Sequence, residues 1–357
     1  MKIKQLFLSI AIMLTVGLTI NAQTKNVDLD NFRCPVTYRL IPEEPLDPLF
    51  FTYSVKINAS KSTENRVSLS NLEDAVRISG QQKVSLNENP FLLITVDLGD
   101  LIITGSNVRE TKTESKDKEG KITVHYAYHA DISYTFESSS KFSLGDKTLI
   151  THLTHKRSTP HYYRSQEYKN RKEAVDFWNN NRDVLIPQFT SDLSAAAVKE
   201  ASYYGSLWYG FYIKKDTEII QITDTKKHTE NEAFKAICAS VKEIFGTMTP
   251  NEGLKKEDLE EAIEYFKSIP DRYTDIKLKS DIKLRYAAYY NLCKIYLHLE
   301  DLENVYHYAD LLIQNEHDKK DGEKLKKSAD ELKEMFSRTE IKTRHFNPED
   351  HFGGNQE

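Results

Sequence analysis

The sequence predicts an α+β fold, in which a β-rich N-terminal domain precedes an all-α domain of helical repeats. Between about residues 27 and 165, apolar residues alternate or form short runs bounded by turns, as in an antiparallel sheet or sandwich. From Glu230 onward they recur every three or four residues, which is the helical period. The chain has 357 residues, and a single core rarely grows past about 250–300 residues, so two domains are expected.

The first 22 residues predict a signal peptide. Lys2 and Lys4 form a short basic region, Leu6–Ile20 is almost wholly apolar, and Ala22 offers a small residue for cleavage. No later apolar run approaches the roughly 20 residues that span a bilayer, so no transmembrane segment is expected. The first cysteine is Cys34, too far from the cleavage point for a lipoprotein. We therefore expect an exported protein, either periplasmic or extracellular.

Charge argues against a nucleic-acid partner. Removal of Lys2 and Lys4 with the signal peptide would shift the formal net charge from −5 to −7, whereas nucleic-acid binding requires a basic footprint. The end of the signal, Ile20–Gln23, resembles export signals of Bacteroidota, a group of Gram-negative bacteria. This resemblance implies a cell-envelope protein.

The β-rich domain is expected over residues 23–226. Two helices and a hairpin follow its strands, and Lys215-Asp216 would form the turn of that hairpin. We expect the hairpin to join or cap the preceding sheet. The expected strands are Phe51–Ile57, Phe91–Val96, Leu101–Thr104, Ile122–Ala130 and Ile132–Phe136, the helices are Asn170–Asn181 and Ser191–Trp208, and the hairpin is Phe211–Thr223.

The helical domain is expected over residues 227–340, followed by a polar, disordered tail over residues 341–357. Within it, Asp281–Glu316 contains two helical patterns that meet at Leu299–Asp301 with almost no loop. So short a connection makes the helices antiparallel. The other expected helices are Ala233–Phe245, Lys256–Phe266 and Gly322–Phe336.

The region of about residues 254–338 resembles a tetratricopeptide repeat. In that family an aromatic residue is followed three residues later by Leu, then by a small residue and then by Tyr. The second helix matches more loosely, Glu300 replaces the family's turn glycine, and His317 replaces its closing proline. The matching residues are Tyr289, Leu292, Cys293 and Tyr296 in the first helix, Val305, Ala309 and Leu312 in the second, and Ala262, Phe266 and Ile269 in an upstream echo. Such repeats stack and bind peptides or proteins, so the resemblance implies binding rather than catalysis.

Helical spacing also suggests a contact surface. On the best-formed helix, Tyr286, Tyr290 and Lys294 fall on a different face from Tyr289 and Tyr296. If the face with Tyr289 and Tyr296 packs in the core, the other face is a candidate partner-binding surface, because tyrosine is favoured at interfaces.

Histidines suggest a weaker, alternative site. His125 and His129 lie four residues apart on one expected strand, and His152 follows with His155 and His161. Two or three rings could bind zinc or copper, with Asp131 or Glu137 as a further ligand. Their spacing matches no ligand motif, and exposed histidine on a half-solvated sheet is the ordinary explanation. His125, His129 and His152 are therefore hypothetical metal ligands, and the sequence assigns no catalytic or cofactor-binding residue.

The chain lacks the local motifs of common enzymes. There is no Gly-x-Ser-x-Gly, no phosphate-binding glycine loop and no Cys-x-x-Cys, although a carboxylate pair would leave no such motif. The cysteines Cys34, Cys238 and Cys293 are expected to be buried and free, with a Cys238–Cys293 bridge as the alternative.

The sequence therefore favours a non-catalytic cell-envelope scaffold or adaptor, which binds a protein or peptide through the helices and needs no cofactor. A glycan- or surface-binding module in the β domain is the alternative, which an exposed aromatic platform would favour. A metal-dependent hydrolase is a further alternative. The partner and the oligomeric state are left open.

Overall fold

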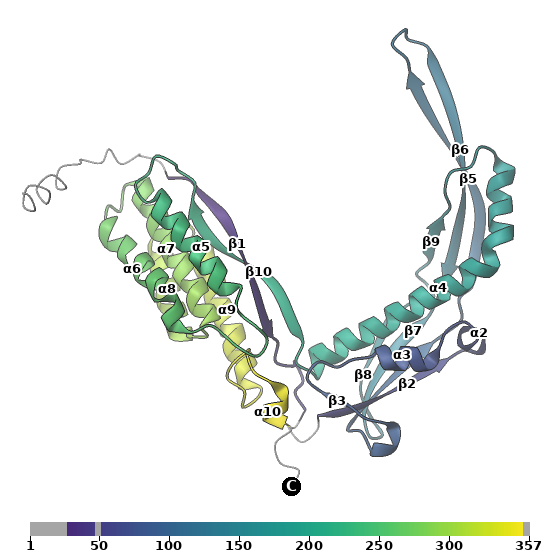
Figure 1. Ribbon diagram of the computed structural model, residues 1–357, viewed down its shortest axis with the longest axis horizontal. Coiled ribbons are helices and arrows are strands. Elements are labelled where there is room, and N and C mark those ends of the chain that lie inside the picture. The colour runs from purple at the N-terminus through teal and green to yellow at the C-terminus, as the bar shows by residue number, and fades with distance from the viewer. Residues whose placement is uncertain (1–26, 47–50, 353–357) are drawn as a thin grey trace, which may run out of the picture. The chain divides into compact units, whose positions relative to one another are not determined.

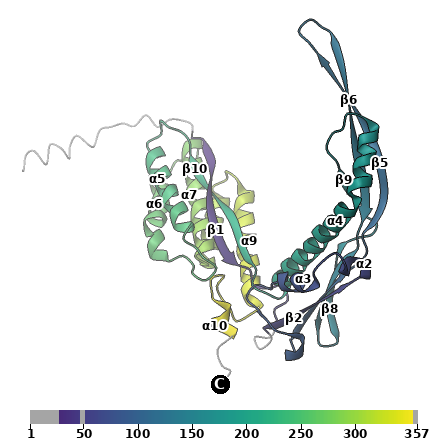
Figure 2. The same ribbon diagram turned by 45° about the vertical axis from the view of Figure 1, so that its right-hand side comes forward.

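A computed structural model describes residues 27–46 and 51–352 of the chain, so the predicted signal peptide lies outside the described residues. The described chain forms two compact units (Figures 1 and 2). Of the described residues, the helical unit contains residues 27–39 and Ile213–Phe346, and the sheet unit contains residues 40–46, 51–212 and 347–352. The predicted α+β class is confirmed, because antiparallel sheets dominate the N-terminal region and helices the C-terminal region.

The sheet unit contains two separate sheets. The larger has the strand order β3-β2-β4-β7-β8, and the smaller has the order β5-β6-β9. In the larger sheet β4 runs parallel to β2 and antiparallel to β7, whereas every pair in the smaller sheet is antiparallel. The strands are β2 (Thr52–Ala59), β3 (Gln82–Lys83), β4 (Leu92–Leu98), β5 (Ile102–Lys116), β6 (Ile122–Thr135), β7 (Ser138–Leu144), β8 (Lys147–His155) and β9 (His161–Arg164).

A single long helix, α4 (Arg171–Trp208), contacts strands of both sheets (Figure 1). Two separate helices were expected here, but the structure has one. The helical spacing of apolar residues continues on both sides of Pro187, since Leu185, Phe189 and Leu193 are all buried. Phe189 stacks on Tyr134 of the smaller sheet with ring centroids 4.5 Å apart. Burial of this apolar face offsets the backbone hydrogen bond that Pro187 removes.

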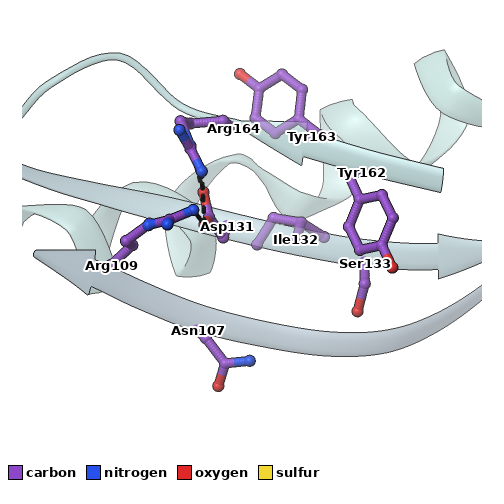
Figure 3. A pocket seen from close by; sticks show the side chains of 8 residues that line it. All are labelled: Asn107, Arg109, Asp131, Ile132, Ser133, Tyr162, Tyr163 and Arg164. Carbon is purple, nitrogen blue, oxygen red and sulfur yellow. Dashed lines mark hydrogen bonds and ion pairs between the residues drawn. The ribbon is translucent and has the colours of Figure 1, made fainter. Parts of the chain in front are cut away.

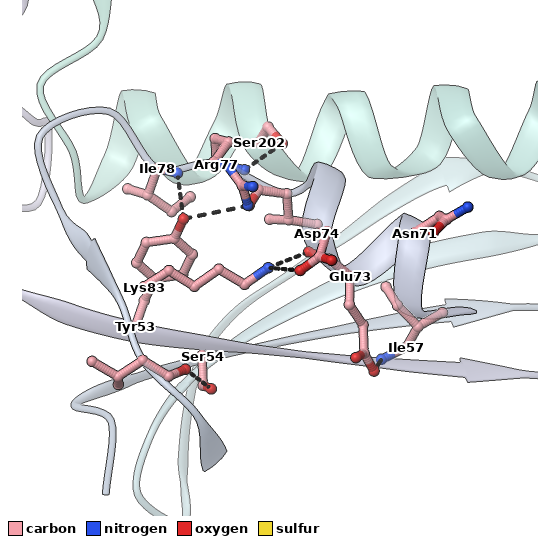
Figure 4. A network of polar contacts seen from close by, with 12 residues as sticks. Tyr53, Ser54, Ile57, Asn71, Glu73, Asp74, Arg77, Ile78, Lys83 and Ser202 are labelled. Atoms are coloured by element: carbon pink, nitrogen blue, oxygen red, sulfur yellow. Dashed lines mark hydrogen bonds and ion pairs between the residues drawn. The ribbon is translucent and has the colours of Figure 1, made fainter. Parts of the chain in front are cut away.

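Short helices α2 (Lys61–Glu64) and α3 (Leu69–Ala75) occupy the crossover between β2 and β4. Figure 4 shows how polar contacts fix the segment after α3. The Tyr53 hydroxyl accepts the Ile78 N–H at 3.2 Å and donates to the Val76 carbonyl at 3.3 Å. Lys83 pairs with Asp74 at 3.7 Å. Burial raises the pKa of Tyr53, so the hydroxyl keeps the proton that it donates.

The helical unit begins with a two-stranded ribbon rather than with a helix. Strand β1 (Leu29–Arg39) pairs antiparallel with β10 (Ile213–Thr223), from Leu29 opposite Thr223 to Arg39 opposite Ile213. The expected hairpin over Phe211–Thr223 is therefore wrong: Lys215 and Asp216 lie within one continuous strand. Alternation identified the strand, but its partner lies far away in the sequence, and the whole segment Leu40–Tyr212 is inserted between the two.

Helices α5 and α7 pack on this ribbon. Near the end of β10 the buried Asn291 side chain accepts the Gln221 N–H at 2.7 Å and donates to the Gln221 carbonyl at 2.9 Å. The amide thereby satisfies both backbone groups on the outer side of β10, as a neighbouring strand would. The helices of this unit are α5 (Asn231–Phe245), α6 (Glu260–Arg272), α7 (Lys279–His298), α8 (Leu302–Gln314) and α9 (Lys319–Ser337).

The units do not follow the expected ranges 23–226 and 227–340, because β1 and β10 pack with the helices.

The expected disordered tail also begins too early. Ile341, Arg344 and Phe346 are buried, and Arg344 pairs with Glu300 at 3.0 Å, so the chain stays packed through residue 346. Helix α10 (Pro348–Phe352) follows, and residues 353–357 lie outside the described part. Across the described residues, no helix combines the length and apolar character that a membrane crossing needs.

Candidate functional site

The face of α7 that was predicted to bind a partner is covered by the chain itself. Tyr286 is only 6% exposed, and its hydroxyl donates to Asp321 of α9 at 2.7 Å. Tyr290 is half-buried, and the Lys294 ammonium lies 5.5 Å from its ring centroid. Lys294 pairs with Glu218 of β10 at 2.9 Å. This face is therefore part of the packing between α7, α9 and the ribbon, not an open surface.

Glu218 is the centre of a largely buried charge cluster. It accepts hydrogen bonds from Lys294 and from Nε2 of His298, at 2.9 Å and 3.0 Å. Burial alone would raise the pKa of Glu218, but the His298 hydrogen bond and the Lys294 charge outweigh it and lower the pKa to about 2. Burial lowers the pKa of His298, so a neutral ring donates its Nε2–H to the carboxylate. The cluster holds β10 against α7.

The histidine candidates do not form a metal site. His129 contacts the Ser165 carbonyl through Nδ1 at 3.1 Å, and His152 contacts Glu200 through Nε2 at 3.2 Å. His125 is exposed on β6. No group of three or more His, Cys, Asp or Glu side chains that could hold a metal ion occurs within residues 27–46 and 51–352. The described structure thus gives His129 and His152 separate protein partners.

The three cysteines are buried and unbridged. Burial raises the pKa of the Cys34 thiol to about 11, and it also raises the pKa values of Cys238 and Cys293. Protonated thiols are poor nucleophiles and poor metal ligands. The cysteines therefore act as small buried side chains, and the alternative of a Cys238–Cys293 bridge is wrong.

An open polar surface lies on the smaller sheet of the sheet unit. Side chains alternate across a strand, so β6 presents Tyr134 toward α4 and Ser133 to the opposite face. The same alternation holds for β9, where Tyr163 stacks near Phe189 of α4, with centroids 5.2 Å apart, and Tyr162 points away. We call the side away from α4 the outer face.

Pairing of the strands brings distant residues together on this outer face. Asp131 of β6 lies opposite Asn107 of β5 and Arg164 of β9. In the next row, Ser133 lies opposite Gly105 and Tyr162. Together with Arg109, whose guanidinium is 4.0 Å from Asp131, these side chains surround a shallow hollow with a volume of about 580 Å³ (Figure 3).

A fixed ion pair forms one side of the hollow. Arg164 donates from Nε and Nη2 to the two Asp131 oxygens, at 2.8 Å and 3.1 Å. This two-point hydrogen bond lowers the pKa of Asp131 and holds both planar groups in one orientation. Figure 3 shows Arg164 and Arg109 converging on Asp131 from neighbouring strands. Planar groups fixed in this way can bind a ligand with little further loss of side-chain freedom.

An aromatic ring stands on the other side. Tyr162 is 76% exposed, so its ring is accessible to a ligand that can stack on it. Across β6 from it, Gly105 of β5 leaves room for the Ser133 side chain, since a Cβ at Gly105 would lie 2.7 Å from the Ser133 Oγ. The hollow thus combines one exposed aromatic face and several oriented hydrogen-bonding groups.

Sequence reasoning named Asp131 only as a possible metal ligand and missed Asn107, Arg109, Tyr162 and Arg164. No local motif marks these residues, since they meet only through the pairing of three strands. Strand alternation in the segment His161–Arg164 was the one available signal.

No protein-family model matches the chain, and no curated protein matches it.

Proposed function

We propose that this chain is a non-catalytic, saccharide-binding protein of the cell envelope, with its binding site on the outer face of the smaller sheet. The exposed Tyr162 ring beside the fixed Asp131–Arg164 pair is the observation that carries the proposal. The predicted signal peptide supports an envelope location, where saccharides are abundant.

The chemistry of the hollow suits a sugar ring. A pyranose has an apolar face of C–H groups and a rim of neighbouring hydroxyls. The Tyr162 ring can stack on the apolar face, since aromatic side chains supply a large apolar surface and tolerate a polar surrounding. Asn107, Asp131 and Arg109 offer planar donors and acceptors for pairs of hydroxyls. The volume of about 580 Å³ fits one or two sugar units.

The site is shallow and open to water, so binding should be weak. A Kd on the order of 1 mM per sugar ring follows from the small number of atoms that such a site can bury. Weak single-site binding is compatible with retention on a polymer that offers many copies of the ligand.

The test is affinity electrophoresis of the purified chain through gels that contain peptidoglycan fragments, a neutral polysaccharide or a uronic-acid polysaccharide. Tyr162→Ala should weaken retention about tenfold, whereas Tyr162→Phe should retain most of it, because stacking needs the ring and not the hydroxyl. Tyr126→Ala is the matched control: Tyr126 is 51% exposed on β6 but on the face that α4 packs against, so retention should not change. Equal retention of wild type and Tyr162→Ala in every gel would sink the proposal.

The adaptor function inferred from the helices predicts a different result. The consecutive helices α6 to α9 support the repeat resemblance, which stays a prediction, but β10 and α9 cover the face that was expected to bind. Cross-linking of the chain in its own envelope would then capture one protein through exposed lysines such as Lys320, with no retention on polysaccharide. That outcome would replace the saccharide proposal with the adaptor.

A further inference from the structure

The hairpin of β5 and β6 forms a long arm with an open edge. β5 is the outermost strand of its sheet, and no strand in the described part of the chain pairs with its other side. All residues from Lys112 to Lys116 are exposed, and the arm extends past the N-terminal end of α4 (Figures 1 and 2). An open edge presents backbone N–H and C=O groups that another strand can bind.

Hydrogen bonds of the neighbouring strand show which β5 groups point to this edge. Tyr128 exchanges both of its backbone hydrogen bonds with Tyr168, on the side of β6 away from β5. Glu110 lies opposite Tyr128, and two residues opposed in this way direct their backbone groups outward from the pair. Alternate residues share a direction, so every second residue from Glu110 through Lys116 offers its N–H and C=O to the open edge.

The charges along this edge match those of a second copy of the same strand that runs in the opposite direction. Residues at equal distances on either side of Thr113 carry opposite charges, and the uncharged Thr111 mirrors the uncharged Ser115. The oppositely charged pairs are Lys112 with Glu114, Glu110 with Lys116, and Arg109 with Asp117. In the isolated chain Lys112 and Glu114 pair with each other at 2.5 Å.

We propose that the chain forms a homodimer by antiparallel pairing of two β5 edges around a twofold axis at Thr113. Lys112 of each copy then lies opposite Glu114 of the other, with their outward backbone groups in hydrogen-bonding register. Opposite charges directly across a strand pair attract, and like charges repel. Such an interface uses the same surface on both copies, as a closed dimer requires.

The charges also select this register. If the pairing slipped by two residues in one direction, Lys112 would face Lys112 of the second copy and Glu110 would face Glu114. A slip in the other direction would oppose Glu114 with Glu114 and Lys112 with Lys116. Both registers that lie two residues away and keep the hydrogen-bonding phase therefore place like charges together, whereas pairing about Thr113 places opposite charges together.

Disulfide trapping tests the position of the axis. Thr113 directs its backbone inward, so the two Thr113 Cα atoms would form a non-hydrogen-bonded pair roughly 4.5 Å apart, within disulfide reach. Thr113→Cys should give a covalent dimer under mild oxidation. Ser115→Cys is the matched control, because two copies of that position would be roughly 13 Å apart. The native cysteines are buried and should not interfere.

Charge exchange tests the specificity. Sedimentation velocity of the full chain should show a dimer at micromolar concentration, and Lys112→Glu should raise its dissociation constant about tenfold or more. The double variant Lys112→Glu with Glu114→Lys restores opposite charges across the axis and should restore the dimer. A wild-type chain that stays monomeric, equal cross-linking of Thr113→Cys and Ser115→Cys, or a double variant no better than the single one would each overturn the proposal.

Discussion

Single residues of the helical unit show how a covered surface can resemble an open one. Tyr286 and Tyr290 have the spacing of an interaction face, and a helical pattern does separate them correctly from Tyr289. It does not show which face a distant strand covers. Glu218, the anion that neutralises Lys294, lies far away in the sequence, and its alternating segment gives no sign of its partner. The spacing predicted two faces, and only the fold shows that both are packed.

The Glu218 cluster makes the stability of the helical unit depend on pH. The carboxyl has a folded pKa of about 2 against an ordinary value of 4.5, a difference worth about 3 kcal/mol. Because the folded pKa is the lower one, this stability is fully present above pH 4.5 and is lost as the pH falls toward 2. Glu218→Gln should therefore reduce the free energy of unfolding by about 3 kcal/mol at neutral pH.

The difference between wild type and Glu218→Gln should shrink toward zero as the pH is lowered through this window, when urea unfolding is followed by circular dichroism. The control is Glu264→Gln. Glu264 pairs with Lys267 at 3.0 Å on the surface of α6, where an ion pair contributes little, so its effect should be small at every pH. A difference for Glu218→Gln that does not change with pH would contradict the assignment.

At the scale of elements, close packing of α4 depends on one glycine. A Cβ on Gly205 would lie 2.3 Å from the Cδ1 of Ile78 and 3.0 Å from the Cε1 of Phe142. Helical sequences normally gain about 1 kcal/mol when Gly becomes Ala. Here the methyl group would instead force apart α4, the segment after α3 and β7.

We predict that Gly205→Ala lowers the free energy of unfolding by up to about 2 kcal/mol, because an overpacking cost of about 1–3 kcal/mol outweighs the helix gain of about 1 kcal/mol. Ile78→Val removes the Cδ1 atom that the new methyl would meet, at a cost of its own of about 1 kcal/mol. The free energy of unfolding that the double variant loses should be smaller, by about 1 kcal/mol, than the sum of the losses of the two single variants. If the two losses measured by urea unfolding simply add, Ile78 does not limit how closely α4 packs at residue 205.

Elements that were predicted well are those whose determinants are local. The apolar run of β4 is buried at Leu92, Ile94, Val96 and Leu98, and the short link at Leu299–Asp301 does join two helices. Elements that were predicted wrongly depend on distant partners. The segment of the single strand β10 was predicted to be a complete hairpin, because pairing with β1 leaves no mark in its own sequence. The residues of the outer face likewise could not be predicted to lie together, since they come from three strands that are separate in the sequence.

At the scale of the whole molecule, the two proposals support each other. A twofold axis through paired β5 edges stands perpendicular to the joined sheet, so both copies present the outer face, with Tyr162, to the same side. Two weak sites on one side would hold a polysaccharide more firmly than either alone, by raising the effective concentration of the second site. Lys112→Glu, which weakens the dimer, should then reduce retention on a polysaccharide more than it reduces the affinity for the free sugar.

The chain path makes the sheet unit an insertion within the β1–β10 ribbon. Arg39 and Ile213 pair at the point where the chain leaves and returns, so an Asn-Gly turn could join them, as in a tight hairpin. We predict that a chain in which Asn-Gly replaces Leu40–Tyr212, ending at Phe346, folds into the helical unit and unfolds cooperatively by circular dichroism. Its core is complete without the insertion: Cys34, Ile220, Cys238 and Leu292 are each fully buried within residues that remain.

The matched control for this excision also removes Arg39. That deletion slips β1 by one residue against β10, which turns every side chain of one strand to the other face. Phe32 and Val36 would then exchange sides with Arg33 and Thr37, and the free energy of unfolding should fall by several kcal/mol, about the cost of burying unpaired polar groups. Equal stability of the two excised chains would mean that the β1–β10 register does not determine the stability. No cooperative transition in the first chain would mean that the helical unit needs the inserted sheets in order to fold.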